Sequence, residues 1–551
     1  MTSLVELRVL EGPNLYFPRA AIKVTVDVTE WAGADVDPFA APTLMRRLAG
    51  TVRELANRAG THRLAVRVRP TRDPHVFVVA YPWRHRDRAR ALGEAVAAVL
   101  DGSSVEAAAA EVTRTLPGPA PTTIRPRVPV VAVTGTNGKT TTSRMIAHIA
   151  RTEGHLVGWS NTDGVYVDGV LVEPGDYSGP SGAGRVLAHP EVDFAVTETA
   201  RGGILLKGIG VLWNDVSVVT NVTADHLGLQ GIDTVDQLAE VKSVVPRITR
   251  RAGWAVLNAD DPRVLAMRAV TKARPWLFTR DPDSPAVREV LNAGGRATTV
   301  VDGWIVVRDP GVEPLLELAD VPMTLAGLSH FNVENALAAT SAALAAGIGS
   351  EHVVAGLRSF RPDAEHNPGR MNVFSLDGRT VVMDLAHNEA GLAALVEILR
   401  GLRTAGGRLL LGLGAVGDRT DELVEMLGEI GARDSDEVVI GHKEHYLRGR
   451  TTEELDALFR AGAARVGVGE VPAYPTELAA LQELVRRSRP GDVIGLMCHA
   501  EREQVHQWII DQGGTADAPE VLREKVRAAT GGTDVPRSAM PQIDVPRNDV
   551  P

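Results

Sequence analysis

The chain has 551 residues, of which 44% are hydrophobic and 23% are charged. This length exceeds what one hydrophobic core usually organises, so the composition predicts an enzyme of two to four domains. The formal net charge of -10 and an aromatic content of 4% exclude a typical nucleic-acid-binding protein. Such proteins bind phosphate backbones through basic surfaces and stack bases on aromatic side chains.

The cysteine count and the hydropathy pattern predict a cytoplasmic protein. Cys498 is the one cysteine of the chain, which excludes an internal disulfide and a cysteine-built metal cluster and fits a reducing compartment. The N-terminus lacks a basic segment followed by an apolar run, and no segment approaches the roughly 18 apolar residues of a membrane span. We therefore expect no membrane partner, while a homo-oligomer is compatible with the sequence.

Residues 1–114 predict a small α+β domain. Apolar and polar residues alternate at 22–28, 64–68 and 76–81, as in half-buried strands, with helical periods between and after them. Its arginines suggest a basic face, although an ordinary solvated surface explains them equally well. The prolines of residues 115–127 then predict a stiff linker.

Two α/β domains are expected beyond the linker. Residues 128–325 contain VPVVAVTG, DFAVTET, VSVVTN and WAVLNADD, which are apolar enough for the strands of a buried parallel sheet. Residues 326–512 begin with the helical segment NVENALAATSAALAAG and continue through the strand-like segments TVVMDLA, RLLLGLG, EVVIGH and DVIGLMC. Residues 513–551 are rich in Gly, Pro and Asp without periodicity, and we expect them to be disordered.

A glycine-rich turn predicts a nucleotide site. In VPVVAVTGTNGKTTTSRMIAHIA it connects a buried strand to an amphipathic helix, so that backbone amides converge on one point. Lys139 is placed to neutralise phosphate oxygens, and the Thr140 hydroxyl to bind Mg²⁺. A strict P-loop has a further glycine where this chain has Val133, so the match is to a shorter variant. The residues expected to bind ATP here are Gly135, Thr136, Asn137, Gly138, Lys139, Thr140 and Thr141.

The variant TGTNGKTTT is typical of the Mur ligase family. Further segments follow in the family's order: NTDGVYVDG, ETARGGIL, VVTNVTADHLGLQGIDT, VKSVV, VLNADDP, NPGRMN, DLAHNEAGL and GDRTDE. The chain therefore resembles a Mur ligase, most closely the C-terminal ligase part of cyanophycin synthetases. The GPN segment at residues 12–14 resembles their N-terminal domain, but their ATP-grasp domain has no counterpart here. The resemblance implies an α/β fold with a central P-loop parallel-sheet domain and a Rossmann-like C-terminal domain, preceded by the small α+β domain.

Three further side chains are expected to act with Lys139 in catalysis. Glu198 ends an apolar strand, where the carboxyl ends of parallel strands open onto ligand sites, and it is placed to hold Mg²⁺ beside Thr140. The resemblance implies that His226 holds a second Mg²⁺. It also matches Lys242 to a lysine that many Mur ligases carbamylate, which turns an ammonium into a carboxylate-like metal ligand. For all three, a structural or surface residue is the alternative.

The resemblance also assigns residues in the C-terminal domain. Asn332 and Asn335 match the adenine-side segment, with an N-capping role as the alternative for Asn332. Arg370 and Asp384 match a hinge-side pair that contacts phosphate and ribose. His387 and Asn388 shape the same loop, in which this chain departs from the family at Leu385 and Glu389. The residues matched to the binding of the incoming amino acid are Asp418 and Arg419, so the expected substrate residues are His387, Asn388, Asp418 and Arg419.

The motif set predicts an ATP- and Mg²⁺-dependent ligase that joins an amino-acid amine to an acceptor carboxylate through an acyl phosphate. A peptide or polymer acceptor is expected, as in cyanophycin synthesis, and the amine is that of an amino acid such as arginine. A ligase of the folylpolyglutamate or poly-γ-glutamate type shares the ATP site and differs in acceptor pockets that motifs do not report. From another class, an ATP-gated binding or scaffold protein without turnover remains open.

Overall fold

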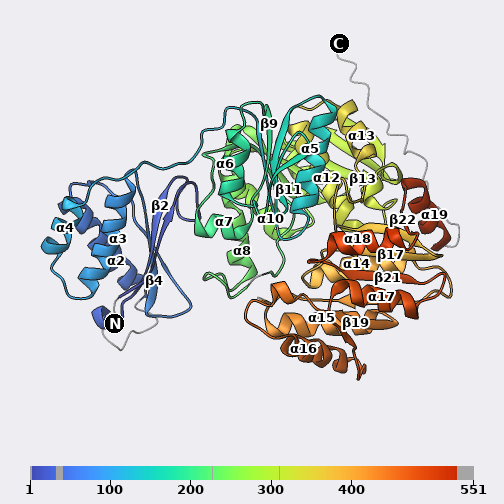
Figure 1. The fold of residues 1–551 in the computed structure, drawn as a ribbon. Helices are drawn as coiled ribbons and strands as arrows, with labels where there is room; N and C mark the ends of the chain where they lie inside the picture. The colour runs from blue at the N-terminus through green and yellow to red at the C-terminus, as the bar shows by residue number, and fades with distance from the viewer. Residues whose placement is uncertain (1–2, 33–40, 226, 310, 418, 530–551) are drawn as a thin grey trace, which may run out of the picture. The chain divides into compact units, whose positions relative to one another are not determined.

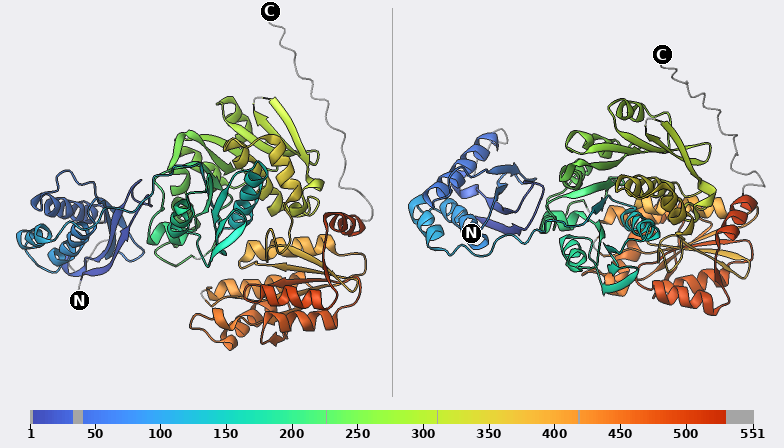
Figure 2. Two further views of the ribbon diagram at one scale, coloured as in Figure 1. Left: turned by 45° about the horizontal axis from the view of Figure 1, so that its top comes forward. Right: turned by 90° about the horizontal axis from the view of Figure 1, so that it is seen from above.

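The computed structural model describes residues 3–32, 41–225, 227–309, 311–417 and 419–529. The chain divides into two compact units, Met1–Trp276 with Ala342–Ile348, and Leu277–Ser341 with Gly349–Pro551. Figures 1 and 2 show their elements in chain order by colour. The division between the units does not coincide with the boundaries expected at residues 115, 128 and 326, so the finer division into domains stays a prediction.

The first 114 residues form an antiparallel sheet with the strand order β1-β2-β4-β3. Helices α2, α3 and α4 cover one face of this sheet (Figure 1). Apolar residues of β2, including Ile22, Val24 and Val26, are fully buried beneath them. The α+β prediction is confirmed, although β1 was not predicted. The elements are β1 Leu4–Leu10, β2 Ala21–Asp27, α1 Thr29–Ala32, α2 Ala41–Arg58, β3 Arg67–Pro70, β4 Val76–Pro82, α3 Arg86–Leu100 and α4 Val105–Arg114.

The larger sheet of the first unit is built around parallel strands in the order β11-β10-β5-β9-β6. Antiparallel strands β7 and β8 extend it beyond β6. All residues of β5 and β9 are buried, as expected for strands covered on both faces. The elements are β5 Val130–Thr134, α5 Lys139–Thr152, β6 Val157–Ser160, β7 Gly164–Val167, β8 Val170–Pro174, α6 Pro180–Ala188, β9 Phe194–Glu198, α7 Arg201–Leu206, β10 Asn214–Val219, α8 Val235–Lys242, α9 Val244–Arg247, β11 Thr249–Asn258, α10 Pro262–Ala266 and η2 Met267–Ala269.

The second unit contains a separate sheet with the strand order β20-β19-β18-β21-β17-β16-β22. Strands β20, β19, β18, β21 and β17 are parallel. At one edge β16 pairs antiparallel with β17, and β22 pairs antiparallel with β16. The predicted strands TVVMDLA, RLLLGLG, EVVIGH and DVIGLMC correspond to β17, β18, β19 and β21. The sheet elements are β16 Asn372–Leu376, β17 Arg379–Asp384, α14 Glu389–Leu402, β18 Leu409–Leu413, α15 Asp421–Asp434, β19 Glu437–Gly441, η5 Glu444–Tyr446, α16 Thr452–Arg465, β20 Ala473–Tyr474, α17 Glu477–Arg487, β21 Val493–Met497, α18 Arg502–Asp511 and β22 Thr515–Ala516.

Between β11 and β16 the chain forms β12 and an antiparallel meander, β13-β14-β15. Its elements are β12 Arg274–Phe278, α11 Pro285–Asn292, β13 Arg296–Val301, β14 Trp304–Asp309, β15 Gly311–Glu317, η3 Leu318–Asp320, η4 Pro322–Thr324, α12 His330–Ala345 and α13 Ser350–Ser359. Helix α12 matches the predicted helix NVENALAATSAALAAG. Asn332 lies inside this helix, so the alternative that Asn332 is an N-cap is wrong.

The prediction that the chain is disordered from residue 513 is wrong for its first part. Residues Thr515–Ala516 form β22 against β16, and Pro519–Ala529 form helix α19. The composition misled the prediction because α19 is amphipathic and buries Leu522 and Val526. Arg523 of α19 also forms an ion pair of 3.3 Å with Asp320. Residues 530–551 lie outside the described part of the chain.

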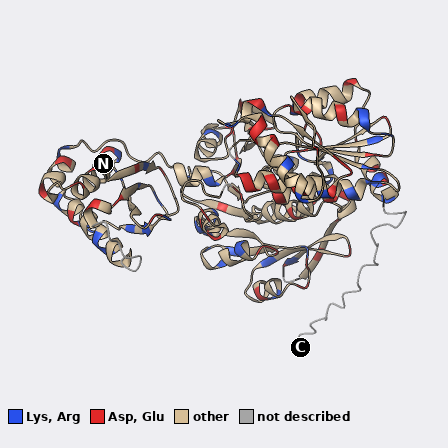
Figure 3. Ribbon diagram, turned by 90° about the horizontal axis from the view of Figure 1, so that it is seen from below, with Lys and Arg blue, Asp and Glu red and all other residues tan. Residues whose placement is uncertain are grey.

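Within the described residues, no helix is long and apolar enough to cross a membrane. Basic and acidic residues are interspersed along the helices of both units (Figure 3).

Candidate functional site

The phosphate loop lies between β5 and α5, as predicted. Gly138 caps α5 in the left-handed region with φ of 84°, and Gly135 also has a positive φ of 153°. A Cβ atom at Gly135 would lie 1.8 Å from Thr220 Oγ1, so only glycine permits this approach of the two loops. The turn therefore presents the first backbone amides of α5 at the carboxyl edge of the sheet, an arrangement that binds phosphate.

The segment after β10 holds the phosphate loop in place. Thr136 N donates to Asn221 O at 2.8 Å, and Asn137 N donates to Asn221 Oδ1 at 2.9 Å. Thr220 Oγ1 donates to Asn137 O at 2.6 Å. The next strand supports the same segment, because Asn258 Nδ2 donates to Thr220 O at 2.8 Å. The sequence analysis assigned no role to Thr220, Asn221 and Asn258, although they lie in the motifs VVTNVTADH and VLNADDP.

Thr140 and Glu198 form the pair of oxygen donors that was predicted for Mg²⁺. The Thr140 hydroxyl donates to Glu198 Oε2 at 2.8 Å, and both side chains are buried. Hydroxyl and carboxylate oxygens suit a hard cation, and Mg²⁺ usually takes only one or two carboxylates besides phosphate and water. Among the described residues, no three His, Cys, Asp or Glu side chains gather into a metal site.

Lys139 and Lys242 meet at the same loop. Lys139 Nζ donates to Thr136 O at 2.8 Å, and Lys242 Nζ donates to Gly135 O at 2.5 Å. Lys242 is buried, so the alternative of a surface lysine is wrong. Burial lowers the pKa of Lys242 well below its usual value, and the charge of Lys139 lowers it further. In these surroundings the Lys242 amine stays neutral down to a lower pH than the amine of an exposed lysine.

His226 lies outside the described residues, so its predicted role stays a prediction. Its neighbour Asp225 is described and interacts electrostatically with Lys242 and with Arg201. Arg201 is buried at the start of α7 and donates from Nη1 to Leu229 O at 3.5 Å. Sequence reasoning missed Arg201, although it stands in the motif ETARGGIL, only three residues after Glu198. The first unit thus gathers three cationic side chains around Glu198 and Asp225.

The second unit contains the residues matched to the adenine and ribose side. Asn332 and Asn335 are buried on α12, and Asn335 Nδ2 donates to Asn332 Oδ1 at 3.1 Å. Asp384 is the last residue of β17 and accepts from Met371 N at 2.8 Å. Burial raises the pKa of Asp384 to about 6, while the charge of Arg370 opposes this shift. The two side chains interact electrostatically, while their expected contacts with phosphate and ribose stay a prediction.

The expected substrate residues follow the carboxyl ends of β17 and β18. His387 Nδ1 lies 3.0 Å from Leu385 O, so Nδ1 donates a hydrogen bond to this carbonyl. Asn388 Oδ1 accepts from Gly391 N at 2.9 Å and caps α14, so its side chain serves this helix. Arg419 is buried before α15. Asp418 lies outside the described residues.

A buried polar cluster follows β19 and β21, and sequence reasoning missed it. Lys443 Nζ pairs with Glu477 at 3.1 Å and contacts His499 Nδ1. Glu477 also accepts from three successive backbone amides, those of His499 at 2.7 Å, Ala500 at 2.9 Å and Glu501 at 2.8 Å. Burial lowers the pKa of His499 to about 3, and the charge of Lys443 adds to this. Electrostatic interactions reach His387 from His499 and Arg419 from Lys443, so the cluster adjoins the expected substrate residues.

Comparison with known domain families decides the identity of the fold. The family described as "Mur ligase middle domain" matches residues 133–343. The family described as "Mur ligase, glutamate ligase domain" matches residues 369–498. Together these two matches span more than half of the chain. The chain belongs to the Mur ligase family.

Individual Mur ligase relatives match the same region. The cyanophycin synthetase of Trichormus variabilis is 43% identical over 341 residues, which are 62% of this chain and 38% of that protein. The chain thus spans less than half the length of the cyanophycin synthetases it matches. The UDP-N-acetylmuramyl-tripeptide synthetase of Deinococcus radiodurans is 29% identical over 378 residues, which are 66% of this chain and 71% of that protein.

Solved structures confirm the fold. Escherichia coli FolC in complex with DHPP and ADP superposes with a TM-score of 0.52 at 20% identity, over 71% of this chain and 90% of that chain. A bifunctional folylpolyglutamate synthase/dihydrofolate synthase with Mn, AMPPNP and L-glutamate bound gives a TM-score of 0.51 at 17% identity, over 69% and 88% of the two chains. At these identities the similarity establishes the Mur ligase fold alone.

Outside the two matched Mur ligase domains, the N-terminal sheet domain contains a cationic hollow of about 500 Å³. We call it the arginine hollow, after Arg19, Arg63, Arg84 and Arg88; His62, His85 and Trp83 also line it, and none of its lining residues is acidic. Arg19, Arg63 and Arg84 make no ion pair with any described residue, whereas Arg86 and Arg90 pair with Asp87 and Glu94. Fewer arginines therefore contribute to the predicted basic face than the number of arginines in this domain suggests.

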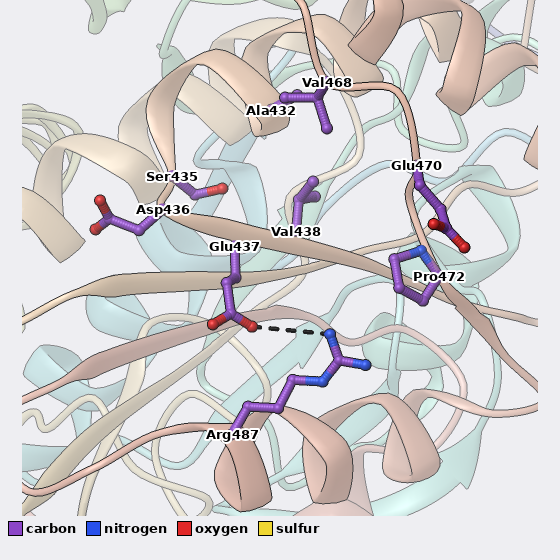
Figure 4. A pocket seen from close by; sticks show the side chains of 9 residues that line it. All are labelled: Ala432, Ser435, Asp436, Glu437, Val438, Val468, Glu470, Pro472 and Arg487. Carbon is purple, nitrogen blue, oxygen red and sulfur yellow. Dashed lines mark ion pairs between the residues drawn. The ribbon is translucent and has the colours of Figure 1, made fainter.

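A second hollow, of about 460 Å³, lies in the glutamate ligase domain (Figure 4). Asp436 and Glu437 lie at the start of β19, and Arg487 at the end of α17 forms an ion pair of 3.8 Å with Glu437. The hollow is therefore at the amino ends of the parallel strands. Ligand sites of such sheets lie at the carboxyl ends, where His387, Arg419 and Lys443 are found. We assign no ligand to this hollow.

Proposed function

We propose that the chain is an ATP- and Mg²⁺-dependent carbon–nitrogen ligase that joins an amino-acid amine to an acceptor carboxylate. The observation that carries this proposal is the buried contact of 2.8 Å between the Thr140 hydroxyl and Glu198, directly beside the phosphate loop. Bound there, Mg²⁺ neutralises phosphate charge during phosphoryl transfer. The Mur ligase fold and the relatives' names, which are those of ligases and synthetases, support the same chemistry.

The proposed reaction has two displacement steps. The acceptor carboxylate attacks the γ-phosphorus of ATP, the bond from that phosphorus to the β–γ bridging oxygen breaks, and ADP leaves. The amine then attacks the carbonyl carbon of the acyl phosphate, loses a proton, and releases phosphate. The amides of the phosphate loop and the ammonium of Lys139 stabilise the charge that develops on the phosphoryl oxygens. Thr140 and Glu198 hold the metal that shares this charge.

We propose that Lys242 is carbamylated and acts with His226 in holding a second Mg²⁺. Carbamylation adds CO₂ to a neutral amine, and burial lowers the pKa of Lys242 in the direction that favours the neutral form. The product is an anion, which would offset the positive charges of Lys139 and Arg201 nearby. Arginine offers no comparable chemistry, which explains a lysine at this position in a chain that otherwise favours arginine.

The second unit is proposed to bind adenine and the amino acid. Asn332 and Asn335 are the proposed contacts of the base, and Arg370 and Asp384 those of phosphate and ribose. For the amino acid we propose His387, Asn388, Asp418 and Arg419. The chain has a single cysteine, Cys498, and so no internal disulfide, which fits the proposed action in the reducing cytoplasm.

An anionic acceptor is supported by the arginine hollow. Arg19, Arg63 and Arg84 are exposed there, and carboxylates are the groups that arginine binds with two parallel hydrogen bonds. A peptide or polymer that carries several carboxylates offers such groups. We therefore propose an acidic peptide-like acceptor, as in cyanophycin synthesis.

A folylpolyglutamate-type ligase is the second candidate, because motifs do not report the acceptor pockets in which such ligases differ. The two candidates share the ATP site and differ in the acceptor. An ATP-gated scaffold without turnover is the third reading. The intact set of Lys139, Glu198 and Lys242 argues against it.

The experiment that tests these readings measures phosphate release and product mass. Purified protein is incubated with ATP and Mg²⁺ and a panel of amino acids, each paired with aspartyl peptides, glutamyl peptides or a folate. Phosphate release that accompanies the gain of one amino-acid residue by an aspartyl or glutamyl peptide supports the proposal. Gain of glutamate by the folate instead supports the second candidate, and ATP binding with no product across the panel supports the scaffold.

Lys139→Ala is the matching variant. We expect turnover to fall by at least about a hundredfold, because a charge that stabilises the transferring phosphoryl group is lost. Lys272→Ala removes an exposed lysine of the same unit and serves as the control. Equal activity of the two variants would remove the assignment of this site.

A further inference from the structure

The N-terminal sheet domain contacts the Mur ligase middle domain, within the first unit, through the GPN motif at residues 12–14. The proposed reaction has not used this motif. Ile209 N donates to Pro13 O at 2.7 Å, and a Cβ atom at Gly12 would lie 1.9 Å from Ile209 O. Only glycine permits so close an approach of two backbones. Residues 11–17, which we call the GPN loop, therefore dock on the segment that follows α7.

The side chain of Asn14 closes the GPN loop on itself. Asn14 is 1% exposed, and its Oδ1 accepts from Tyr16 N at 2.9 Å and from Phe17 N at 3.0 Å. Its Nδ2 donates to Gly12 O at 2.8 Å. The side chains of Leu15, Tyr16 and Phe17 are buried as well. A loop that is bonded internally and buried in this way docks in one fixed shape.

The N-terminal domain also binds helix α8, through Arg69 of β3. Nη1 and Nη2 of Arg69 donate to the two carboxylate oxygens of Glu240 at 2.8 and 2.6 Å, the bidentate geometry that fixes an arginine on a carboxylate. Arg247 of α9 donates from Nη1 to Leu15 O at 3.4 Å. The N-terminal domain therefore contacts the chain both before and after Lys242.

Lys242 lies on the opposite side of α8 from this contact. Successive residues of a helix turn by about 100°, so the side chains of Glu240 and Lys242 point roughly 200° apart. There Lys242 Nζ donates to Gly135 O at 2.5 Å. Helix α8 has only eight residues, and a capping box of Thr234 and Gln237 fixes its first turn. The helix thus connects the N-terminal domain on one side to the phosphate loop on the other.

We propose that the N-terminal domain positions the ATP site, with Arg69 as a positioning residue that acts through Glu240 and α8 on Lys242. The GPN loop supplies the second point of attachment, at the segment after α7. The proposal rests on the proposed function, which places Lys242 in the metal–nucleotide site. Arg69 acts on neither the nucleotide nor the metal directly. It fixes the direction from which the Lys242 side chain approaches the phosphate loop.

The exposure of the Arg69–Glu240 pair supports a positioning role over a stabilising one. The two side chains are 34% and 41% exposed. Exposed ion pairs contribute little to the free energy of unfolding, so the fold should persist without this pair. Two parallel hydrogen bonds nevertheless fix an orientation, which a single point charge does not. Effects on nucleotide binding can therefore be measured separately from effects on folding.

The test is a cycle of charge reversals across the pair. The variants of the full chain are Arg69→Glu, Glu240→Arg and the double variant Arg69→Glu/Glu240→Arg. Arg58→Glu is the control, because Arg58 is an arginine of the same domain that pairs with Glu54 and Glu106 of that domain. ADP binding is followed by calorimetry, first with EDTA and then with Mg²⁺, and melting temperatures are recorded. The ratio of the two affinities reports the metal-dependent gain in binding, and it needs no turnover.

We expect each single reversal to reduce the metal-dependent gain about tenfold, because two like charges then face each other across the contact. The double variant should recover most of the gain, since it restores the ion pair in the opposite sense. Arg58→Glu should keep the wild-type gain, and melting temperatures should change little.

A wild-type gain in Arg69→Glu, or a loss that the double variant does not recover, would overturn the proposal. An equal loss in Arg58→Glu would also overturn it, because the charge of the domain and not the contact would then be responsible. A wild-type protein whose ADP affinity does not respond to Mg²⁺ would overturn the proposed function and this proposal with it. The two failures are therefore distinguishable.

Discussion

Gly135 is the residue at which the phosphate loop comes closest to the segment after β10. Gly135→Ala places a Cβ atom where Thr220 Oγ1 now lies, in a conformation with φ of 153° that disfavours side chains. We expect the free energy of unfolding to fall by about 2–4 kcal/mol, from backbone strain and overpacking together. ATP affinity should fall too, because Asn137 loses its support. Urea unfolding measures the first effect and calorimetry the second.

The control for Gly135→Ala is Gly50→Ala in α2. A Cβ atom at Gly50 meets no atom within 4 Å, and alanine favours a helix interior over glycine by roughly 0.5–1 kcal/mol. This variant should be slightly more stable than wild type and bind ATP normally. Similar losses in the two variants would contradict the assignment of Gly135 to a conformation that only glycine tolerates.

His499 predicts a pH dependence of stability in the second unit. Burial and the charge of Lys443 lower its pKa to about 3, whereas the unfolded chain binds the proton at the usual value of about 6.5. As pH falls below 6.5 the unfolded state therefore takes up a proton that the native state does not, and stability falls. From pH 7 to pH 5 this contribution is about 2 kcal/mol. His499→Gln should lose correspondingly less stability over this range.

The comparison for His499→Gln is His445→Gln, which replaces an exposed histidine two residues after Lys443. Glutamine at position 499 still accepts a hydrogen bond from Lys443, so the fold is expected to persist. His445→Gln should keep the wild-type slope of stability against pH. Parallel slopes for wild type and His499→Gln would show that His499 is not a neutral buried group.

Helix α19 is the element that the composition failed to predict. Its apolar face indicates which side chains hold the helix against the second unit. Leu522 is 1% exposed and packs in the second unit, while its neighbour Val521 is 36% exposed. Leu522→Ala should lower the free energy of unfolding by about 2–5 kcal/mol, because it leaves a cavity. Val521→Ala on the same helix should change it by less than about 0.5 kcal/mol. Denaturant unfolding compares them, and equal effects would mean that α19 does not pack as described.

The elements that could be predicted share one property: the sequence pattern that indicates each of them lies within a few neighbouring residues. The apolar runs of β5, β9 and β21 and the glycine turn before α5 each fit within a few residues, and each was found. Apolar and polar residues also alternate along β1, but only the pairing with β2 distinguishes this segment from a loop. The contacts of Arg69 with Glu240, and of Lys443 with Glu477 and His499, join segments that are distant in sequence. Periodicity and motif spacing do not report such contacts.

At the scale of the whole molecule, some of the expected site residues belong to the first unit and others to the second. The phosphate and metal residues, Thr140, Glu198 and Lys242 among them, belong to the first unit. The residues matched to adenine and to the amino acid, including Asn335 and Arg419, belong to the second. Neither unit contains the whole set that the proposed ligation requires. The N-terminal sheet domain adds a feature that neither matched Mur ligase domain contains, the arginine hollow.

The arginine hollow predicts how the acceptor's affinity depends on salt. Arg63→Ala/Arg84→Ala removes two guanidinium groups that no described acid neutralises, so we expect the KM for acidic peptide acceptors to rise about tenfold at low salt. The KM for ATP should not change. Because exposed charges are screened within about 10 Å at 0.1 M salt, the difference from wild type should shrink as salt is added. Steady-state phosphate release at several ionic strengths measures both constants.

The matched control is Arg53→Ala/Arg72→Ala, which makes the same change in net charge at two exposed arginines of the same domain outside the hollow. If both double variants raised the acceptor KM equally, the effect would come from the charge of the domain as a whole, and the hollow would have no role. A rise confined to Arg63→Ala/Arg84→Ala places the acceptor's carboxylates in the hollow. In that case the N-terminal domain holds the acceptor while the Mur ligase domains activate and extend it.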